Sequence, residues 1–188
     1  MSVRLNRRRF NVRDYYRMAK AGILHEDDRV ELIDGEIVEM APIGHHHAGV
    51  VDRLTYVFIQ AFRGVAQVRV QNPIRLDEWN EPQPDLTLLR PRADFYTSSH
   101  PTSEDILLVV EVADSSLQFD RRVKLPLYAR RGIPEMWLVD LRRQTIAVHR
   151  DPAPDGYRTS TILRRGDRIA PVAFPDREMA VADLLGDR

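Results

Sequence analysis

Two short apolar runs in the middle of the chain constrain its fold more than any other feature. Residues 85–89 and 105–113 consist largely of Val, Leu and Ile, and runs of this length are typical of strands that a sheet buries on both faces. A helix is predicted to begin at Asp120, and residues 135–140 are predicted to form a further strand. Because such units connect as right-handed crossovers, the start of the helix is expected near the end of the strand that carries Glu111.

The rest of the chain predicts further elements around this sheet. They are a helix at 12–21 capped by Asn11, a hairpin of strands 30–33 and 37–40, an amphipathic helix at 46–62, strands at 65–71 and 74–76, and a terminal meander at 145–149, 157–163 and 168–174. The expected fold class is mixed α/β (α+β): a central mixed β-sheet flanked by helices, with an N-terminal helix and β-hairpin and a C-terminal β meander. One domain is expected over residues 11–188, after a flexible basic tail at 1–10. The polar stretch 90–104 is expected to be a long exposed connection near the site, able to act as a lid.

Charge and composition exclude several classes of function. The 188 residues carry 28 acidic and 28 basic side chains, so the molecule as a whole offers no field that would attract a polyanion. Without cysteine there is no disulfide framework, thiolate zinc site or cysteine nucleophile. The longest apolar stretch, residues 106–110, is far shorter than the roughly 20 residues that cross a bilayer, and the arginine-rich N-terminus lacks the apolar core of a secretion signal. A cytoplasmic protein with no membrane association is expected.

Three charged residues stand at the edges of the predicted central elements. Asp85 opens one apolar run, Glu111 lies inside the other, and Lys124, one of only two lysines, lies on the helix that follows. Two carboxylates can hold a hard divalent cation, and an ammonium group can steady a water or a developing anion beside it. An aspartate often caps a turn and a helical lysine often faces solvent, but a glutamate among valines needs a partner or a metal. Together the three residues indicate metal-dependent phosphodiester hydrolysis.

The residues around these three positions resemble a known family. The matching segments are Gln83-Pro84-Asp85, Val110-Glu111-Val112-Ala113, Asp120 to Lys124 with Tyr128, Gly132 to Glu135, Trp137 to Asp140, Glu31 to Glu36 and Met40 to His47. They cover nearly the whole chain and are similar to the Uma-two-type family of restriction-endonuclease-like proteins, within the PD-(D/E)XK nuclease superfamily. The resemblance implies a restriction-endonuclease-like core.

The resemblance also implies the chemistry of the site. Asp85 and Glu111 would bind Mg²⁺ or Mn²⁺ together with the backbone carbonyl of Val112, and Lys124 would orient the attacking water or stabilise the pentacovalent phosphorane. The superfamily usually places a lysine two residues after the glutamate, where this chain has Ala113. Lys124 must therefore reach the site from the helix.

Other residues are candidates for the surroundings of the site. Glu31, His47 and Gln83 match recurrent positions of the family and would line the site, unless their role is structural. The adjacent histidines 45–47 suggest a metal site, but adjacent residues at a helix start point in different directions, which favours incidental histidines. The candidate contacts to a nucleic-acid backbone are Arg121, Arg122, Arg130 and Arg131, while the tail arginines 7–9 are more simply explained as solvated.

These features predict a divalent-metal-dependent endonuclease that hydrolyses phosphodiester bonds in DNA. The alternative is a nucleic-acid-binding or partner-binding module that keeps the fold without turnover, which the missing lysine at position 113 and the zero net charge favour. A carboxylate-pair glycosidase is disfavoured, because sugar sites usually add exposed aromatics, whereas Trp79 and Trp137 lie in a charged turn and an apolar strand. A homodimer would suit duplex cleavage, which needs two cuts, although no heptad or other association motif is present.

Overall fold

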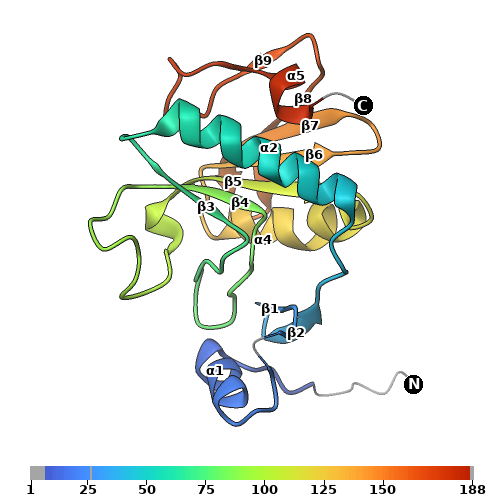
Figure 1. The fold of residues 1–188 in the computed structure, drawn as a ribbon. Helices are drawn as coiled ribbons and strands as arrows, with labels where there is room; N and C mark the ends of the chain where they lie inside the picture. The colour runs from blue at the N-terminus through green and yellow to red at the C-terminus, as the bar shows by residue number, and fades with distance from the viewer. Residues whose placement is uncertain (1–6, 26, 187–188) are drawn as a thin grey trace.

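A six-stranded mixed sheet forms the centre of the computed structural model, which describes residues 7–25 and 27–186 (Figure 1). In spatial order its strands are β3 (Gln67–Val70), β4 (Leu86–Leu89), β5 (Ile106–Ala113), β6 (Glu135–Asp140), β7 (Thr145–Ala153) and β8 (Gly156–Leu163). β5 and β6 are parallel, and the other neighbouring pairs are antiparallel. The predicted mixed sheet with a helical connection between two parallel strands is confirmed.

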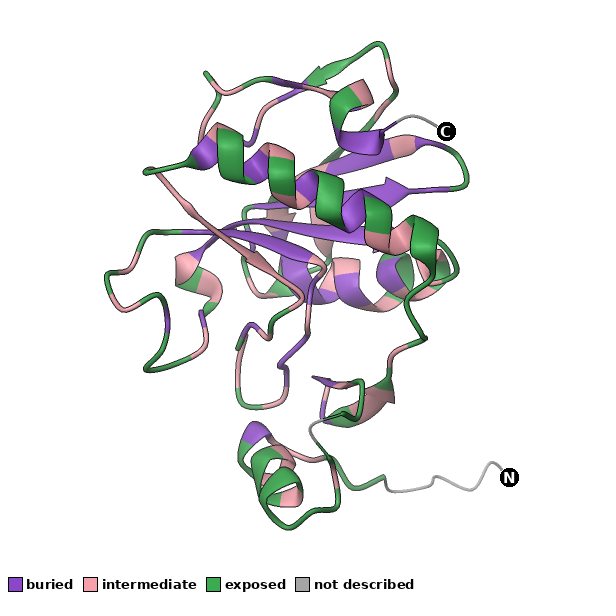
Figure 2. Ribbon diagram, in the orientation of Figure 1, coloured by how far each residue is buried: buried purple, intermediate pink, exposed green. Residues whose placement is uncertain are grey.

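Helices cover both faces of the sheet, which explains the continuous apolar runs. α2 (His45–Phe62) packs on one face, and its buried side faces the strands while its outer side is exposed (Figure 2). The other face carries a helical run made of α3 (Leu117–Phe119), the π-helical segment Asp120–Lys124 and α4 (Leu125–Arg130). β5 supplies residues to both cores: Leu108 and Val110 pack on the α2 side, and Val109 between them packs on the α4 side. All eight residues of β5 are therefore buried.

The N-terminal helix and hairpin follow the sequence prediction closely. α1 (Val12–Lys20) begins after Asn11, whose side chain accepts a hydrogen bond from the backbone N–H of Asp14 at 2.9 Å. β1 (Val30–Ile33) and β2 (Glu36–Glu39) pair around Asp34 and Gly35. Both turn residues have positive φ, 48° and 77°, as this kind of two-residue hairpin turn requires. Residues 1–6 of the predicted basic tail lie outside the described residues.

Two details of the predicted strands are wrong. Residues 74–76 form no strand, because their N–H groups donate to the carbonyls of Pro82, Pro101 and Asn80 in neighbouring loops. The last predicted strand shortens to β9 (Arg168–Ile169), which pairs with β10 (Met179–Ala180) instead of extending the sheet. Pro171, which cannot donate to a strand ladder, follows it closely. A short unpredicted helix, α5 (Val181–Leu185), then packs against α2.

The connection at residues 90–104 lies away from the site, so its interpretation as a lid is wrong. β4 runs antiparallel to β5, which brings the start of β4 beside the end of β5. The connection leaves the opposite end of β4 and returns through a 3-10 turn, Ser103–Asp105, to the start of β5. None of these residues, all of which are described, lines the cavity that holds Asp85.

Within the described ranges, no helix is long and apolar enough to span a membrane.

Candidate active site

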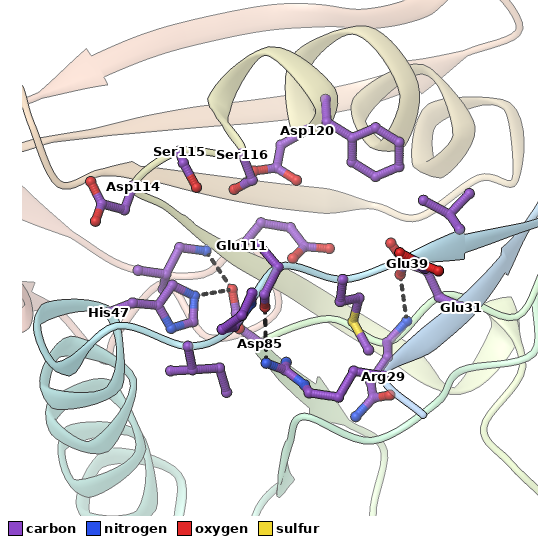
Figure 3. Close-up of a pocket in the computed structure, with 18 of the residues that line it drawn as sticks. Arg29, Glu31, Glu39, His47, Asp85, Glu111, Asp114, Ser115, Ser116 and Asp120 are labelled. Atoms are coloured by element: carbon purple, nitrogen blue, oxygen red, sulfur yellow. Dashed lines mark hydrogen bonds and ion pairs between the residues drawn. The ribbon is translucent and has the colours of Figure 1, made fainter. Parts of the chain in front are cut away.

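The antiparallel pairing of β4 and β5 brings Asp85 and Glu111 to one cavity. Asp85 directly precedes β4, and Leu86 pairs with Val110 of β5. One carboxylate oxygen of Asp85, Oδ2, accepts the backbone N–H of Val112 at 2.8 Å, and the other, Oδ1, accepts the side-chain amide of Gln71 at 3.2 Å. Both carboxylates line a cavity of about 320 Å³, on which side chains from the hairpin, α2 and the segment after β5 converge (Figure 3).

Lys124 reaches the same cavity from the π-helical segment. Its Nζ lies 3.2 Å from Oε1 of Glu111 and 3.1 Å from Oε2 of Glu31, and its side chain is only 7% exposed. The N–H of Leu125 donates to the carbonyl of Asp120, five residues earlier, which is the π-helical pattern. This wider turn places Lys124 and Asp120 on the cavity side of the helix. The structure therefore brings together the three residues that the sequence singled out.

The N-terminal hairpin supplies Glu31 to this group. Leu32 of β1 bridges to Glu81, and the backbone N–H of Gln83 donates to Glu31 Oε2 at 3.1 Å. Glu31 is 2% exposed, and both Glu31 and Gln83 line the cavity. A segment far from β5 in the sequence thus contributes a second carboxylate to the Lys124 ammonium.

His47, in the first turn of α2, contacts Asp85 directly. Its Nε2 lies 3.2 Å from Oδ2 of Asp85 (Figure 3). The hydrogen bond to Asp85 raises the pKa of His47 although burial opposes the change. Burial alone would raise the pKa of Asp85, but hydrogen bonds from His47, Val112 and Gln71 outweigh it and lower that pKa. His45 and His46 do not line the cavity, so the three described adjacent histidines form no common site.

Burial controls the protonation of Glu111 and Lys124. It raises the pKa of Glu111 to about 8, against the opposing effect of the Lys124 ammonium. Burial would lower the pKa of Lys124, but Glu111, Glu31 and Asp120 outweigh it and raise that pKa. Lys124 therefore stays charged, and Glu111 retains a proton more readily than an exposed glutamate.

Asp120 and Tyr128 belong to the site although the sequence prediction gave them no role there. Asp120 is 3% exposed, accepts the Ser116 hydroxyl at 2.7 Å, and has its pKa raised by burial to about 6. The sequence did offer one signal for Asp120: it lies four residues before Lys124, and residues four apart share a helix face. Tyr128, fully buried, donates its hydroxyl to Oε1 of Glu111 at 2.6 Å. Among the described residues, Oε2 of Glu111 has no hydrogen-bond partner and is available to a ligand.

Replacing Tyr128 with phenylalanine is expected to lower the free energy of unfolding by about 1–3 kcal/mol, because the buried carboxyl group of Glu111 loses a hydrogen-bond partner while the ring packing is kept. Urea denaturation at pH 7 measures the change. Tyr56→Phe is the matched control, since Tyr56 is 68% exposed on the outer face of α2. Equal unfolding midpoints for the two variants would contradict the importance of the contact between Tyr128 and Glu111.

The oxygen atoms at this cavity suit a hard divalent cation. The carbonyl of Ala113 accepts the N–H of Leu141 on the β6 side, so the peptide groups of Val112, one residue earlier, face the β4 side. There β4 has not yet begun, which leaves the Val112 carbonyl beside Asp85. Carboxylate and carbonyl oxygens are the ligands that Mg²⁺ and Mn²⁺ prefer. Because the described residues contain no group of three or more His, Asp or Glu side chains able to hold a metal alone, an ion here would need the carbonyl and water as well.

The four arginines predicted to contact nucleic acid differ in their surroundings. Arg130 lies 3.2 Å from Asp34, and Arg131 forms an ion pair with Asp77. Arg121 and Arg122 are exposed on the π-helical segment. None of these four described residues lines the cavity, so a backbone contact would have to be made outside it.

Comparisons with known proteins identify a family and a fold. The model of the Uma2 family, described as "putative restriction endonuclease", matches residues 12–182. A crystal structure of a putative nuclease belonging to DUF820 from Anabaena variabilis ATCC 29413 is similar, with a TM-score of 0.68 and 14% sequence identity, over 88% of this chain and 94% of that chain. No curated protein matches the chain. The similarity to the crystal structure shows a shared fold.

Proposed function

Because the chain belongs to the Uma2 family of putative restriction endonucleases, we propose that its cavity hydrolyses phosphodiester bonds in DNA with Mg²⁺ or Mn²⁺ held between Asp85 and Glu111. The observation that carries the proposal is the convergence of these two carboxylates with the buried ammonium of Lys124. The description of the family as restriction endonucleases is the reason for choosing DNA as the substrate.

Each side chain of the cavity has a role in this proposal. The bound ion would acidify a water ligand and offset negative charge on the phosphate. His47, Gln71 and the N–H of Val112 hold the Asp85 carboxylate in its ionised form and fixed orientation. Tyr128 and Lys124 occupy Oε1 of Glu111, so its Oε2 would be the oxygen that holds the ion. Lys124 also places a fixed positive charge beside the position where the phosphate would gain negative charge.

Cleavage of supercoiled plasmid tests the proposal. The purified protein is expected to nick the plasmid with Mg²⁺ or Mn²⁺, to stop when EDTA is added, and to recover when excess metal is returned. Cleavage that survives the chelator would overturn the role of the metal. No cleavage with either ion, of the plasmid or of its denatured single strands, would overturn the nuclease assignment. Metal-independent DNA binding without cleavage would instead support the alternative of a binding module that has lost turnover.

A further inference from the structure

Four of the larger apolar side chains that line the cavity do not pack in the interior of the protein. Val38, Met40, Ile43 and Phe119 all line it, and Ile43 is 42% exposed. None of these four described residues belongs to either hydrophobic core or packs among the partly buried residues around the cores. We refer to them as the apolar rim. Folding therefore does not explain why these positions are apolar, whereas a flat apolar ligand beside the carboxylates would.

The charges of the cavity do not suit the backbone of a duplex. Its lining contains six carboxylate side chains, Glu31, Glu39, Asp85, Glu111, Asp114 and Asp120. The lysine and arginine side chains that line it are Lys124, already paired with two of these carboxylates, and Arg29. Duplex binding depends on several lysines and arginines that each meet a phosphate. Even with a divalent ion bound, the six carboxylates outnumber the positive charges of the ion, Lys124 and Arg29, so the cavity has no surplus positive charge for a row of phosphates.

The size and depth of the cavity also favour a flexible strand. Its volume of about 320 Å³ lies at the lower end of the range for small-molecule sites, roughly 300–1,000 Å³. Glu31, Glu111 and Lys124, at 2–5% exposure, lie below the surface. A single strand can bend so that one phosphate enters the cavity while its base turns aside. In a duplex, pairing and stacking fix the bases and keep the backbone from bending into so deep a cavity.

From this arrangement we propose that the cavity accepts an unpaired nucleotide of single-stranded DNA, with the base packed on the apolar rim and the adjoining phosphate facing Asp85 and Glu111. The inference rests on the proposed nuclease function and specifies its substrate. Stacking of a base on an aromatic side chain contributes about 1–3 kcal/mol and tolerates any base. Phe119, the aromatic member of the rim, is expected to supply most of this contact.

Cleavage of three labelled DNAs of one sequence tests the inference: a single strand, its duplex, and the duplex with a central mismatched bubble. With Mn²⁺, the single strand and the bubble are expected to be cut at least about tenfold faster than the duplex. Phe119→Ala should slow cutting of the single strand by about tenfold, which corresponds to 1.4 kcal/mol, without changing Mn²⁺ affinity in calorimetry, and Phe119→Trp should retain the rate. Tyr56→Ala, which removes an exposed aromatic side chain outside the cavity, is the matched control. A duplex cut as fast as the single strand would overturn the inference.

Binding to the Glu111→Gln variant separates this inference from the proposed function. If wild-type protein cuts none of the three DNAs, the nuclease assignment fails, but fluorescence anisotropy of the variant still decides the inference. Tighter binding of the single strand than of the duplex, weakened about tenfold by adding Phe119→Ala, would support it. Equal or tighter duplex binding, or no effect of Phe119→Ala, would overturn it.

Discussion

Glu111→Gln and Asp85→Asn are each expected to lower the rate of DNA cleavage at saturating Mg²⁺ by a factor on the order of 10³ or more. Each change keeps the shape of the side chain but removes a negatively charged oxygen ligand, so that the ion binds more weakly and acidifies its water less. Single-turnover cleavage measures the rate, and isothermal titration calorimetry with Mn²⁺ measures the affinity for the metal.

The matched control for these two variants is Asp52→Asn. Asp52 is exposed on α2 and lies outside the cavity, so its replacement is expected to leave both cleavage rate and metal affinity unchanged. Thermal unfolding shows whether each variant is folded at the assay temperature. Cleavage by folded Glu111→Gln and Asp85→Asn proteins at the wild-type rate would contradict the assignment of the metal site.

Lys124→Met is expected to lower the free energy of unfolding by roughly 3–5 kcal/mol at pH 9, because the buried carboxylates of Glu31 and Glu111 lose their cation. For a chain of this size the loss corresponds to a decrease in Tm of about 6–20 °C. The same variant should not cleave DNA. Differential scanning calorimetry measures the first effect, and the plasmid assay measures the second.

The stability deficit of Lys124→Met should grow with pH. Burial already raises the pKa of Glu111 from its unfolded value of 4.5 to about 8, and Lys124 opposes that increase. Without Lys124 the folded pKa rises further, so the folded state binds a proton that the unfolded state releases, and stability falls as pH rises from 4.5 through the folded pKa. The wild-type protein loses stability in the same way only up to its folded pKa of about 8, whereas the variant continues to lose it above that pH, so the deficit should be larger at pH 9 than at pH 5. The control is Lys20→Met, which replaces the other lysine, an exposed residue of α1. An equal deficit of Lys124→Met at both pH values would contradict this account.

The sequence predicted the central sheet and the three principal charged residues for definite physical reasons. Strands buried on both faces leave long apolar runs, and a charged residue within such a run, as at Glu111, needs a partner. Asp120 and Tyr128 were harder to assign, because an aspartate at a helix start looks like a cap, and a tyrosine on an apolar helix face looks like core. β10 and α5 are too short to leave a periodic pattern: β10 is defined by its pairing with β9, and α5 packs against α2.

The candidate metal site depends on pairings that no local pattern encodes. Asp85 meets Val112 because β4 and β5 are antiparallel, and Glu31 meets Lys124 because the hairpin bridges to Glu81. Both contacts join segments that are distant along the chain. The family resemblance suggested that these residues lie together, but the distances and the direction of each hydrogen bond follow from the three-dimensional arrangement.

The π-helical segment makes the spacing between residues 120 and 128 intolerant of length changes. Each residue of a regular α-helix advances the direction of its side chain by about 100°. Deleting one residue within Asp120–Lys124 would let the run relax into an ordinary helix that could still pack on the sheet. Asp120 and Tyr128 would then turn relative to one another, and their two contacts could no longer form together. We therefore expect single-residue deletions there to leave the sheet and its packing intact but to separate the contacts of Asp120 and Tyr128, so the irregular turn matters for the candidate site more than for the architecture.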